Sequence, residues 1–311
     1  QDHASRSKSE NSCSSTPTVG FAFDWDDNIF YMPTNIQIRH KENKEDIQLL
    51  STGQFAVHRK DIAKTGAYKN YEIYDESFIY FGDDPKKEKN FLLEDIKGAI
   101  SSGTDAWQGP AWGDFVEALK HPYIAENLQI ITARRHSPSS FIEALSYLKG
   151  KGYIDHLPQE KNIWPVNHPN FRHRALSELN LNSDEKGSVQ NPSAAKTIVM
   201  LDRLKTISNK ELCQSAPKMI SSRDSKQKER THLWGFSDDD FGNFEKAKKV
   251  LQKELNQGKW KNVKITLFFT GVNVKDVPPH ALVLRANQEA RKFEDFEDQE
   301  WKAQLLSLIH I

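Results

Sequence analysis

The chain has 311 residues, with 43 lysines and arginines against 43 aspartates and glutamates, so its formal net charge is zero. With 37% hydrophobic and 10% aromatic residues it is too apolar for a disordered chain, and its length fits about two domains, or one domain with a large insertion. The charge balance gives no reason to expect nucleic acid or a membrane surface as a partner, and no apolar run approaches the roughly 20 residues of a membrane span. The two cysteines exclude a disulfide scaffold and a zinc site made of cysteine alone.

Residues 1–18 are polar and serine-rich, which predicts a disordered leader. The sequence begins at Gln1 rather than at a methionine, as it would after removal of a signal peptide or after simple trimming of the chain. We therefore expect a soluble protein, either cytoplasmic or exported, and the sequence leaves the compartment and the oligomeric state open.

Short apolar runs alternate with amphipathic stretches through most of the chain. The first run, residues 19–23, is apolar at every position, which is typical of a strand buried on both faces of a parallel sheet. Helices are predicted from Ser137 to a stop at Gly150, from Ser193, and over 244–255. The remaining strands are predicted at 128–131, 162–166, 232–236 and 265–269. This order predicts an α/β fold with a Rossmann-like, three-layer parallel sheet.

Residues 35–83 follow a different pattern, in which polar and apolar residues alternate between charged turns. The alternation predicts half-exposed antiparallel strands at 36–40, 71–74 and 77–81. Two helices follow, one from about Asn90 and one over 112–119. We interpret the chain as an α/β core, an inserted α+β cap and an amphipathic C-terminal helix, at residues 19–34 with 126–286, at 35–125 and at 287–311 respectively.

Acidic residues follow two of the predicted strands. Asp24 and Asp26 come directly after the first strand, and Asp238-Asp239-Asp240 follow the strand at 232–236. Because ligands bind beyond the carboxyl ends of parallel strands, we expect both acidic clusters at one site. Unpaired carboxylates near a core are costly, and Mg²⁺, which prefers oxygen ligands, would offset that cost. An acidic turn is the alternative for the first cluster, whereas a calcium loop is disfavoured because its D-x-D-x-D-G pattern is absent.

The residue types at this edge of the sheet fit phosphate chemistry. The Asp24 carboxylate could attack a phosphorus atom, and Asp26, two residues on, could protonate the leaving group and then activate water. The hydroxyl of Thr132 could hydrogen-bond a phosphate oxygen, and Lys196 and Arg134 could neutralise the phosphate. For the last three the alternatives are an ordinary strand-end threonine, a solvated lysine and a surface arginine.

In chain order the sequence offers a strand followed by Asp24-x-Asp26, a strand before Thr132, a helix-borne Lys196, and a strand followed by Asp238-Asp239. This series resembles the motifs of the haloacid dehalogenase-like (HAD) superfamily of phosphohydrolases, over about residues 19–270. The resemblance implies that Asp24 is the nucleophile and Asp26 the general acid and base. It also implies a Mg²⁺ ion held by the Asp24 side chain, the Asp26 backbone carbonyl and Asp238, with Asp239 in support. Thr132 and Lys196 would bind the transferring phosphoryl group.

The chain departs from the family pattern at several positions. Asp27-Asn28 stand where the family usually has Gly-Thr, and Ser237 stands where Gly is frequent. The long separation between Lys196 and Asp238 makes Lys205 a second candidate for the motif lysine.

The sequence thus predicts a Mg²⁺-dependent phosphatase for a small phosphorylated substrate, with residues 35–125 as a cap over the site and with Arg134 and Asn28 as substrate contacts. Two alternatives stay open. One is a non-catalytic binding protein of the same fold, and the other is a phosphatase that processes nucleic-acid ends, which would require a basic groove.

Overall fold

The computed structural model describes residues 16–212, 231–272 and 276–292. Most of the predicted leader (1–15), most of the predicted C-terminal helix (293–311) and both cysteines lie outside these residues. The leader prediction is wrong for Thr18, which is buried and accepts a backbone hydrogen bond of 2.9 Å from Leu233.

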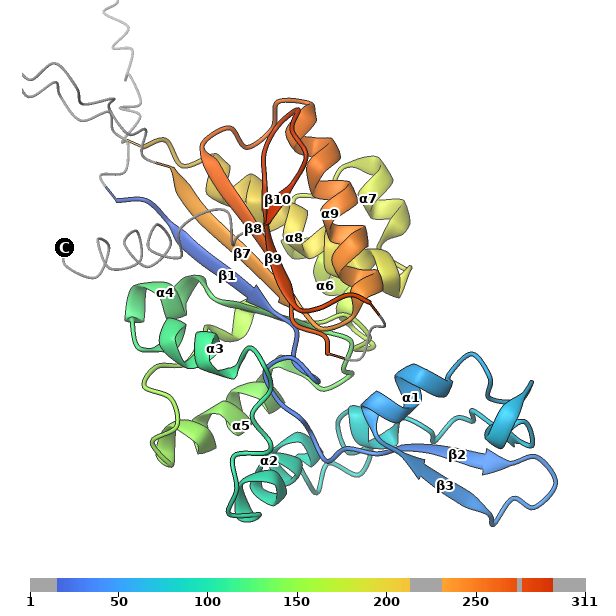
Figure 1. Cartoon of the computed structure of the whole chain (residues 1–311). Coiled ribbons are helices and arrows are strands. Elements are labelled where there is room, and N and C mark those ends of the chain that lie inside the picture. The colour runs from blue at the N-terminus through green and yellow to red at the C-terminus, as the bar shows by residue number, and fades with distance from the viewer. Residues whose placement is uncertain (1–15, 213–230, 273–275, 293–311) are drawn as a thin grey trace, which may run out of the picture.

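A seven-stranded sheet forms the centre of the molecule, in the order β10-β9-β8-β7-β1-β5-β6 (Figure 1). Its parallel part consists of five strands: β1 (Val19–Phe23), β5 (Gln129–Thr132), β6 (Ile163–Pro165), β7 (His232–Asp238) and β8 (Val263–Phe269). All five were predicted, and the α/β class with a mostly parallel sheet is confirmed. Two antiparallel strands extend the β8 edge: β9 (His280–Leu284) and β10 (Arg291–Lys292). Neither was predicted, and β10 makes the helix predicted from residue 287 wrong for its described part.

Helices cover the sheet on both sides and give it two hydrophobic layers. On one side lie α6 (Phe171–Glu178), α7 (Ser183–Ser188), α8 (Pro192–Ser208) and α9 (Phe241–Asn256). On the other lie α2 (Phe91–Ser101), α3 (Trp112–Leu119), α4 (Pro122–Asn127) and α5 (Pro138–Gly150), with a 3₁₀ turn at Glu160–Asn162. Neighbouring residues of β1 divide between the layers, since Ala22 packs in the first and Phe23 in the second. This alternation is the reason that β1 is apolar at every position.

The segment between β1 and α2 forms a small unit that projects from the main body (Figure 1). It contains β2 (Ile36–His40), β3 (Ile47–Leu50), α1 (Thr52–His58) and β4 (Tyr71–Glu72), with 3₁₀ turns at Gly66–Tyr68 and Ile79–Phe81. The sheet is antiparallel, in the order β3-β2-β4, over a core of Ile38, Leu50 and Ile62. We use the name insert for residues 35–83.

Three predictions for this region are corrected. The predicted strand at 71–74 is two residues long, and the one at 77–81 is a 3₁₀ turn, because no described strand pairs with that segment. The helices predicted within the cap, α2 and α3, pack on the main sheet: Ile96 and Phe115 share a hydrophobic cluster with Phe23. Only the insert therefore stands apart from the core.

The ends of the helices follow local sequence signals with one exception. Pro138 begins α5 and Asp240 caps α9, where its side chain accepts from the backbone N–H of Asn243 at 2.9 Å. The helix α5 ends at Gly150, as predicted, but the left-handed conformation expected of Gly150 is adopted by Gly152 (φ 78°).

Candidate active site

The ends of β1 and β7 lie side by side and bring two acidic loops together. Phe23 pairs in register with Ser237, and the backbone N–H of Asp24 donates to the Ser237 carbonyl oxygen at 3.0 Å. Asp24 and Asp238 therefore emerge next to each other at the carboxyl edge of the sheet, where an open α/β fold binds its ligands.

Lys196 bridges these two acids. It lies in the first turns of α8, and its Nζ is 3.0 Å from Asp24 Oδ1 and 3.0 Å from Asp238 Oδ2. Its side chain is 8% exposed, so the alternative of a solvated surface lysine is wrong. Burial lowers the pKa of Lys196, but Asp238 and Asp24 raise it by more, and the net shift is upward. Lys205, the second candidate, instead pairs with Glu185 on α7 at 2.7 Å.

Asp239 completes a cluster of three carboxylates with Asp24 and Asp238, whose oxygens lie within 4.8 Å of one another. Burial raises the pKa of Asp24 to about 7, opposed by Lys196 and assisted by Asp238 and Asp26. Burial raises the pKa of Asp239 to about 9, assisted by Asp238 and Asp24. Three hard oxygen donors that repel one another in a buried site are a donor set that fits a divalent cation such as Mg²⁺.

The loop after β1 is held by Asn28, which is fully buried. Its side-chain N–H groups donate to the carbonyl oxygens of Asp24 and Ser237, each at 3.1 Å. Its Oδ1 accepts from the hydroxyls of Ser237 (2.9 Å) and Thr270 (2.6 Å). The prediction of Asn28 as a substrate contact is therefore wrong, because every hydrogen-bonding position of its amide is used to join the ends of β1, β7 and β8.

Asp27 explains one departure from the family pattern. Its φ of 56° lies in the left-handed region, which favours glycine but which aspartate tolerates. The turn therefore keeps the backbone shape for which glycine is the usual residue.

Asp26 points to Arg134 rather than to the carboxylate cluster. Nε donates to both oxygens of Asp26, at 3.2 and 2.9 Å, and Nη2 donates to Oδ1 at 2.7 Å. Nη2 also donates to the Thr34 hydroxyl at 2.7 Å, and that hydroxyl in turn donates to Asp95 on α2. The Arg134 side chain is fully buried, so the alternative of a surface arginine is wrong. Arg134 lines the cavity described below and its Nη1 has no hydrogen-bond partner among the described residues, and the predicted phosphate contact stays a prediction.

Thr132 is the last residue of β5 and is fully buried. Its hydroxyl oxygen accepts from the backbone N–H of Arg134 at 3.2 Å, and Thr132 does not line the cavity described next. Nearby His136 is also fully buried, and burial together with Arg134 and His168 lowers its pKa to about 2. A neutral histidine of this kind cannot protonate a leaving group near neutral pH.

A cavity of about 660 Å³ opens over the acidic cluster, between the core and the insert. The core contributes its polar side chains, among them Asp24, Asp26 and Lys196. The insert contributes Phe55, Phe78, Phe81, Ile36, Ala56, Thr52 and Arg59. An ion pair joins the two walls, since Arg59 Nη2 lies 3.9 Å from Asp240 Oδ2. The insert thus supplies one wall of this cavity, and its role as a cap stays a prediction.

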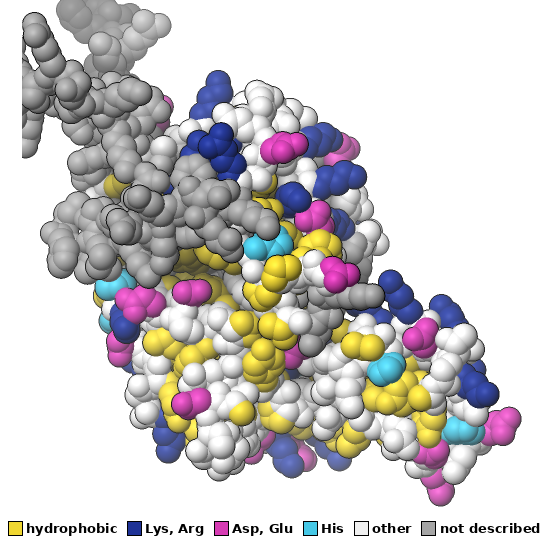
Figure 2. Space-filling model, viewed as in Figure 1, with side chains coloured by type: hydrophobic (Ala, Val, Ile, Leu, Met, Phe, Trp, Pro, Cys, Tyr) yellow, Lys and Arg dark blue, Asp and Glu magenta, His cyan; other side chains and the backbone are white. Residues whose placement is uncertain are grey.

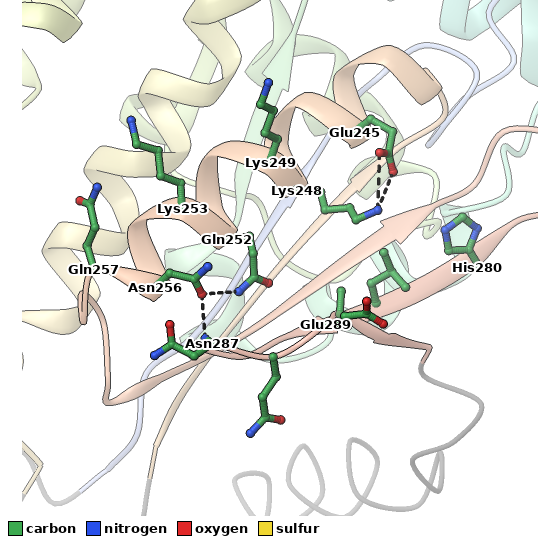
Figure 3. Close-up of a pocket in the computed structure, with 13 residues that line it drawn as sticks. Glu245, Lys248, Lys249, Gln252, Lys253, Asn256, Gln257, His280, Asn287 and Glu289 are labelled. Atoms are coloured by element: carbon green, nitrogen blue, oxygen red, sulfur yellow. Dashed lines mark hydrogen bonds and ion pairs between the residues drawn. The ribbon is translucent and has the colours of Figure 1, made fainter.

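A larger hollow of about 1120 Å³ lies elsewhere, between α9 and the β9–β10 edge (Figure 3). It is lined mainly by lysines and amides, including Lys249, Lys253 and Gln252. Glu245 pairs there with Lys248 at 3.1 Å, and Gln252 donates to Asn256 at 2.8 Å. No acidic cluster faces this hollow among the described residues, so the smaller cavity is the better candidate for chemistry.

The sequence analysis missed several residues of the site. Asn243, in the first turn of α9, donates from Nδ2 to Asp238 Oδ2 at 3.3 Å, and its position five residues after Asp238 was an available signal. Thr34, Asp95 and the phenylalanines of the insert left no such signal, because they reach the site only through the path of the chain.

No protein-family model, curated protein or solved structure matches the chain. None of the helices in the described part of the chain combines the length and the hydropathy that a bilayer crossing requires. On the face drawn in Figure 2, basic and acidic side chains of the described residues are interspersed.

Proposed function

We propose that the protein is a Mg²⁺-dependent phosphomonoester hydrolase of HAD-like architecture that acts through a phospho-aspartate at Asp24. The observation that carries the proposal is the bridge of Lys196 between Asp24 and Asp238 at the mouth of a cavity. Burial of a lysine between two acids carries a large desolvation penalty, and such a group is well suited to bind an anionic substrate.

The bridge leaves one oxygen of the nucleophile available. Lys196 holds Oδ1 of Asp24, and Oδ2 has no hydrogen-bond partner among the described residues. In the first step a bond forms between Asp24 and phosphorus while the bond from phosphorus to the ester oxygen breaks. The ammonium group of Lys196 then stabilises the negative charge on the phosphoryl oxygens.

We assign proton transfer to Asp26, which lines the same cavity. In its protonated form it gives its proton to the departing alkoxide, and the resulting carboxylate then takes a proton from water, which attacks phosphorus and releases phosphate and the free Asp24 carboxylate. Because both oxygens of Asp26 accept from Arg134, this role requires the pair to loosen when substrate binds. A bound Mg²⁺ would be held by Asp24, Asp238 and Asp239 and would neutralise charge between these acids and the phosphoryl group.

The test is to trap the intermediate. Wild-type protein with Mg²⁺ and a ³²P-labelled phosphate ester is quenched in acid within one turnover. We expect protein-bound label that hydroxylamine removes, and borohydride reduction should convert residue 24 to homoserine, as detected by mass spectrometry. Asp24→Asn should lose label and turnover together, whereas Asp61→Asn, an exposed acid of the insert, should keep both. Phosphate release from wild type without any labelled protein would refute the phospho-aspartate.

The non-catalytic binding protein is the second candidate, and the pairing of Asp26 with Arg134 is the observation that favours it. A protein of that kind would bind phosphate or vanadate in the presence of Mg²⁺ but would release no phosphate from any ester. The variant Arg134→Met distinguishes the two candidates further, because it removes the partner of Asp26. If the protein is an enzyme, the variant should have a changed turnover. If it is a binding protein, the variant should hydrolyse no ester.

A further inference from the structure

Three phenylalanines form one wall of the cavity over the acidic cluster. Phe55 comes from α1, and Phe78 and Phe81 come from the end of the insert. Their rings meet edge to face: the centroids of Phe55 and Phe78 are 5.4 Å apart at 86°, and those of Phe78 and Phe81 are 6.1 Å apart at 73°. Phe55 and Phe78 are only half-buried, so part of each ring faces the open cavity. We call these three residues the aromatic wall.

Direct contacts tie the aromatic wall to the acidic loop. The guanidinium carbon of Arg134 lies 4.8 Å from the centre of the Phe81 ring, and the same guanidinium binds Asp26. The Phe81 carbonyl oxygen accepts from the backbone N–H of Arg135 at 2.6 Å. The spacing between wall and acids is therefore fixed by the fold.

The cavity consequently has two chemically different ends. One end holds Lys196 and the carboxylates, and the other offers apolar ring surface from Phe55 and Phe78. Aromatic pairs add to the gain from burial of apolar area, and a small alkyl group would leave the wall wet. A volume of about 660 Å³ leaves room for a ring beside a phosphoryl group.

We propose that the substrate is a phosphate monoester whose leaving group carries an aromatic ring, and that this ring packs on Phe55, Phe78 and Phe81. The proposal rests on the phosphatase function proposed above. It assigns the phosphoryl group to the end of the cavity with Asp24 and the ring to the insert.

The test compares benzyl phosphate with ethyl phosphate, whose leaving alcohols have similar acidity, so that their ratio of kcat/KM reports contacts made by the ring. We expect wild type to prefer benzyl phosphate roughly tenfold or more, and Phe78→Leu to lower that preference by roughly five- to tenfold. Val57→Ala is the matched control, since Val57 lies on α1, is 63% exposed and does not line the cavity. It should leave the ratio unchanged.

Binding of benzylphosphonate and ethylphosphonate, measured by calorimetry with Mg²⁺, separates this inference from the proposed function. One outcome supports ring binding and refutes the phosphatase function. In that outcome no ester is hydrolysed, benzylphosphonate binds at least about tenfold more tightly than ethylphosphonate, and Phe78→Leu removes the difference. Two outcomes would refute ring binding by the aromatic wall but leave the phosphatase function intact. In the first, both esters are hydrolysed with a kcat/KM ratio near one. In the second, Phe78→Leu leaves that ratio and the melting temperature unchanged.

Discussion

Asp239 carries a strongly perturbed carboxyl in the described part of the molecule. Burial beside Asp238 and Asp24 raises its pKa from an ordinary value of 3.8 to about 9, and burial raises that of Asp24 to about 7. A raised carboxyl pKa means that the folded state binds protons that the unfolded state has already lost. In the absence of metal these acids therefore destabilise the fold as pH rises.

This reasoning gives a prediction with a definite sign. Between pH 7 and pH 9, above the range in which His136 titrates in the unfolded chain, the free energy of unfolding of the metal-free protein should fall as pH rises, and Asp239→Asn should flatten that slope. Saturating Mg²⁺ should raise stability more at pH 9 than at pH 5, because only deprotonated carboxylates bind it. Urea midpoints at several pH values measure both effects. Asp61→Asn should retain the wild-type slope, and an equally steep slope in Asp239→Asn would contradict the assignment.

Asn28 has a structural role beside the acids of the site. It makes four hydrogen bonds, three of them buried, that join the ends of three strands, so Asn28→Ala should destabilise the protein by roughly 2–4 kcal/mol. Asn43→Ala, at an exposed turn of the insert, should cost less than about 1 kcal/mol. Denaturant unfolding measures the difference. Equal small losses in the two variants would show that the hydrogen bonds of Asn28 contribute little.

At the scale of the element, the position of each lysine on α8 determines which one contacts the site. Lys196 and Lys205 are nine positions apart, about two and a half helical turns, so they lie on opposite sides of the helix. The first faces the ends of β1 and β7, and the second faces Glu185 and the carbonyl of Asn180.

Exchange of each lysine for methionine should therefore have unequal effects. Lys196→Met leaves two buried acids facing each other, so it should lower the free energy of unfolding by roughly 3–5 kcal/mol. It should also abolish activity. Lys205→Met should lower the free energy of unfolding by about 1 kcal/mol and leave the activity unchanged. A second substitution, Asp24→Asn in the Lys196→Met protein, should restore part of the lost stability by removing one of the unpaired acids. Absence of any such recovery would indicate that Lys196 stabilises the fold by packing rather than by charge.

At the scale of the whole molecule, the main sheet and the insert differ in how much apolar surface they bury. Helices pack on both faces of the main sheet, whereas the fully buried core of the insert is Ile38, Leu50 and Ile62. We expect the insert to open locally at lower free energy than the core. In native-state hydrogen exchange the amides of β2 and β3 should exchange well before those of β1 and β7, and an aromatic phosphonate should slow exchange in the insert. Equal protection of both sheets would show that they unfold as one unit.

The sequence alone determined the features that depend on near neighbours in the chain. Mostly apolar runs identified the five parallel strands, since a strand covered on both faces has few polar positions. The acids that follow β1 and β7 were found in the same way, and the parallel arrangement was enough to bring Asp24 and Asp238 to one edge. The antiparallel strands β9 and β10 were missed because short runs of this kind depend on pairing with neighbouring strands, which the local sequence does not show.

Only the tertiary structure decided what each polar side chain does. Asn28, Arg134 and Lys196 were all predicted to contact the substrate or its phosphate, yet all three are buried, and only Lys196 pairs with the carboxylate cluster. Burial forces a polar group to find partners, and those partners are distant in the chain: Thr270 for Asn28, Asp26 for Arg134, and Asp24 and Asp238 for Lys196. Local pattern carries no record of such pairs, because they form only when the strands and helices pack together.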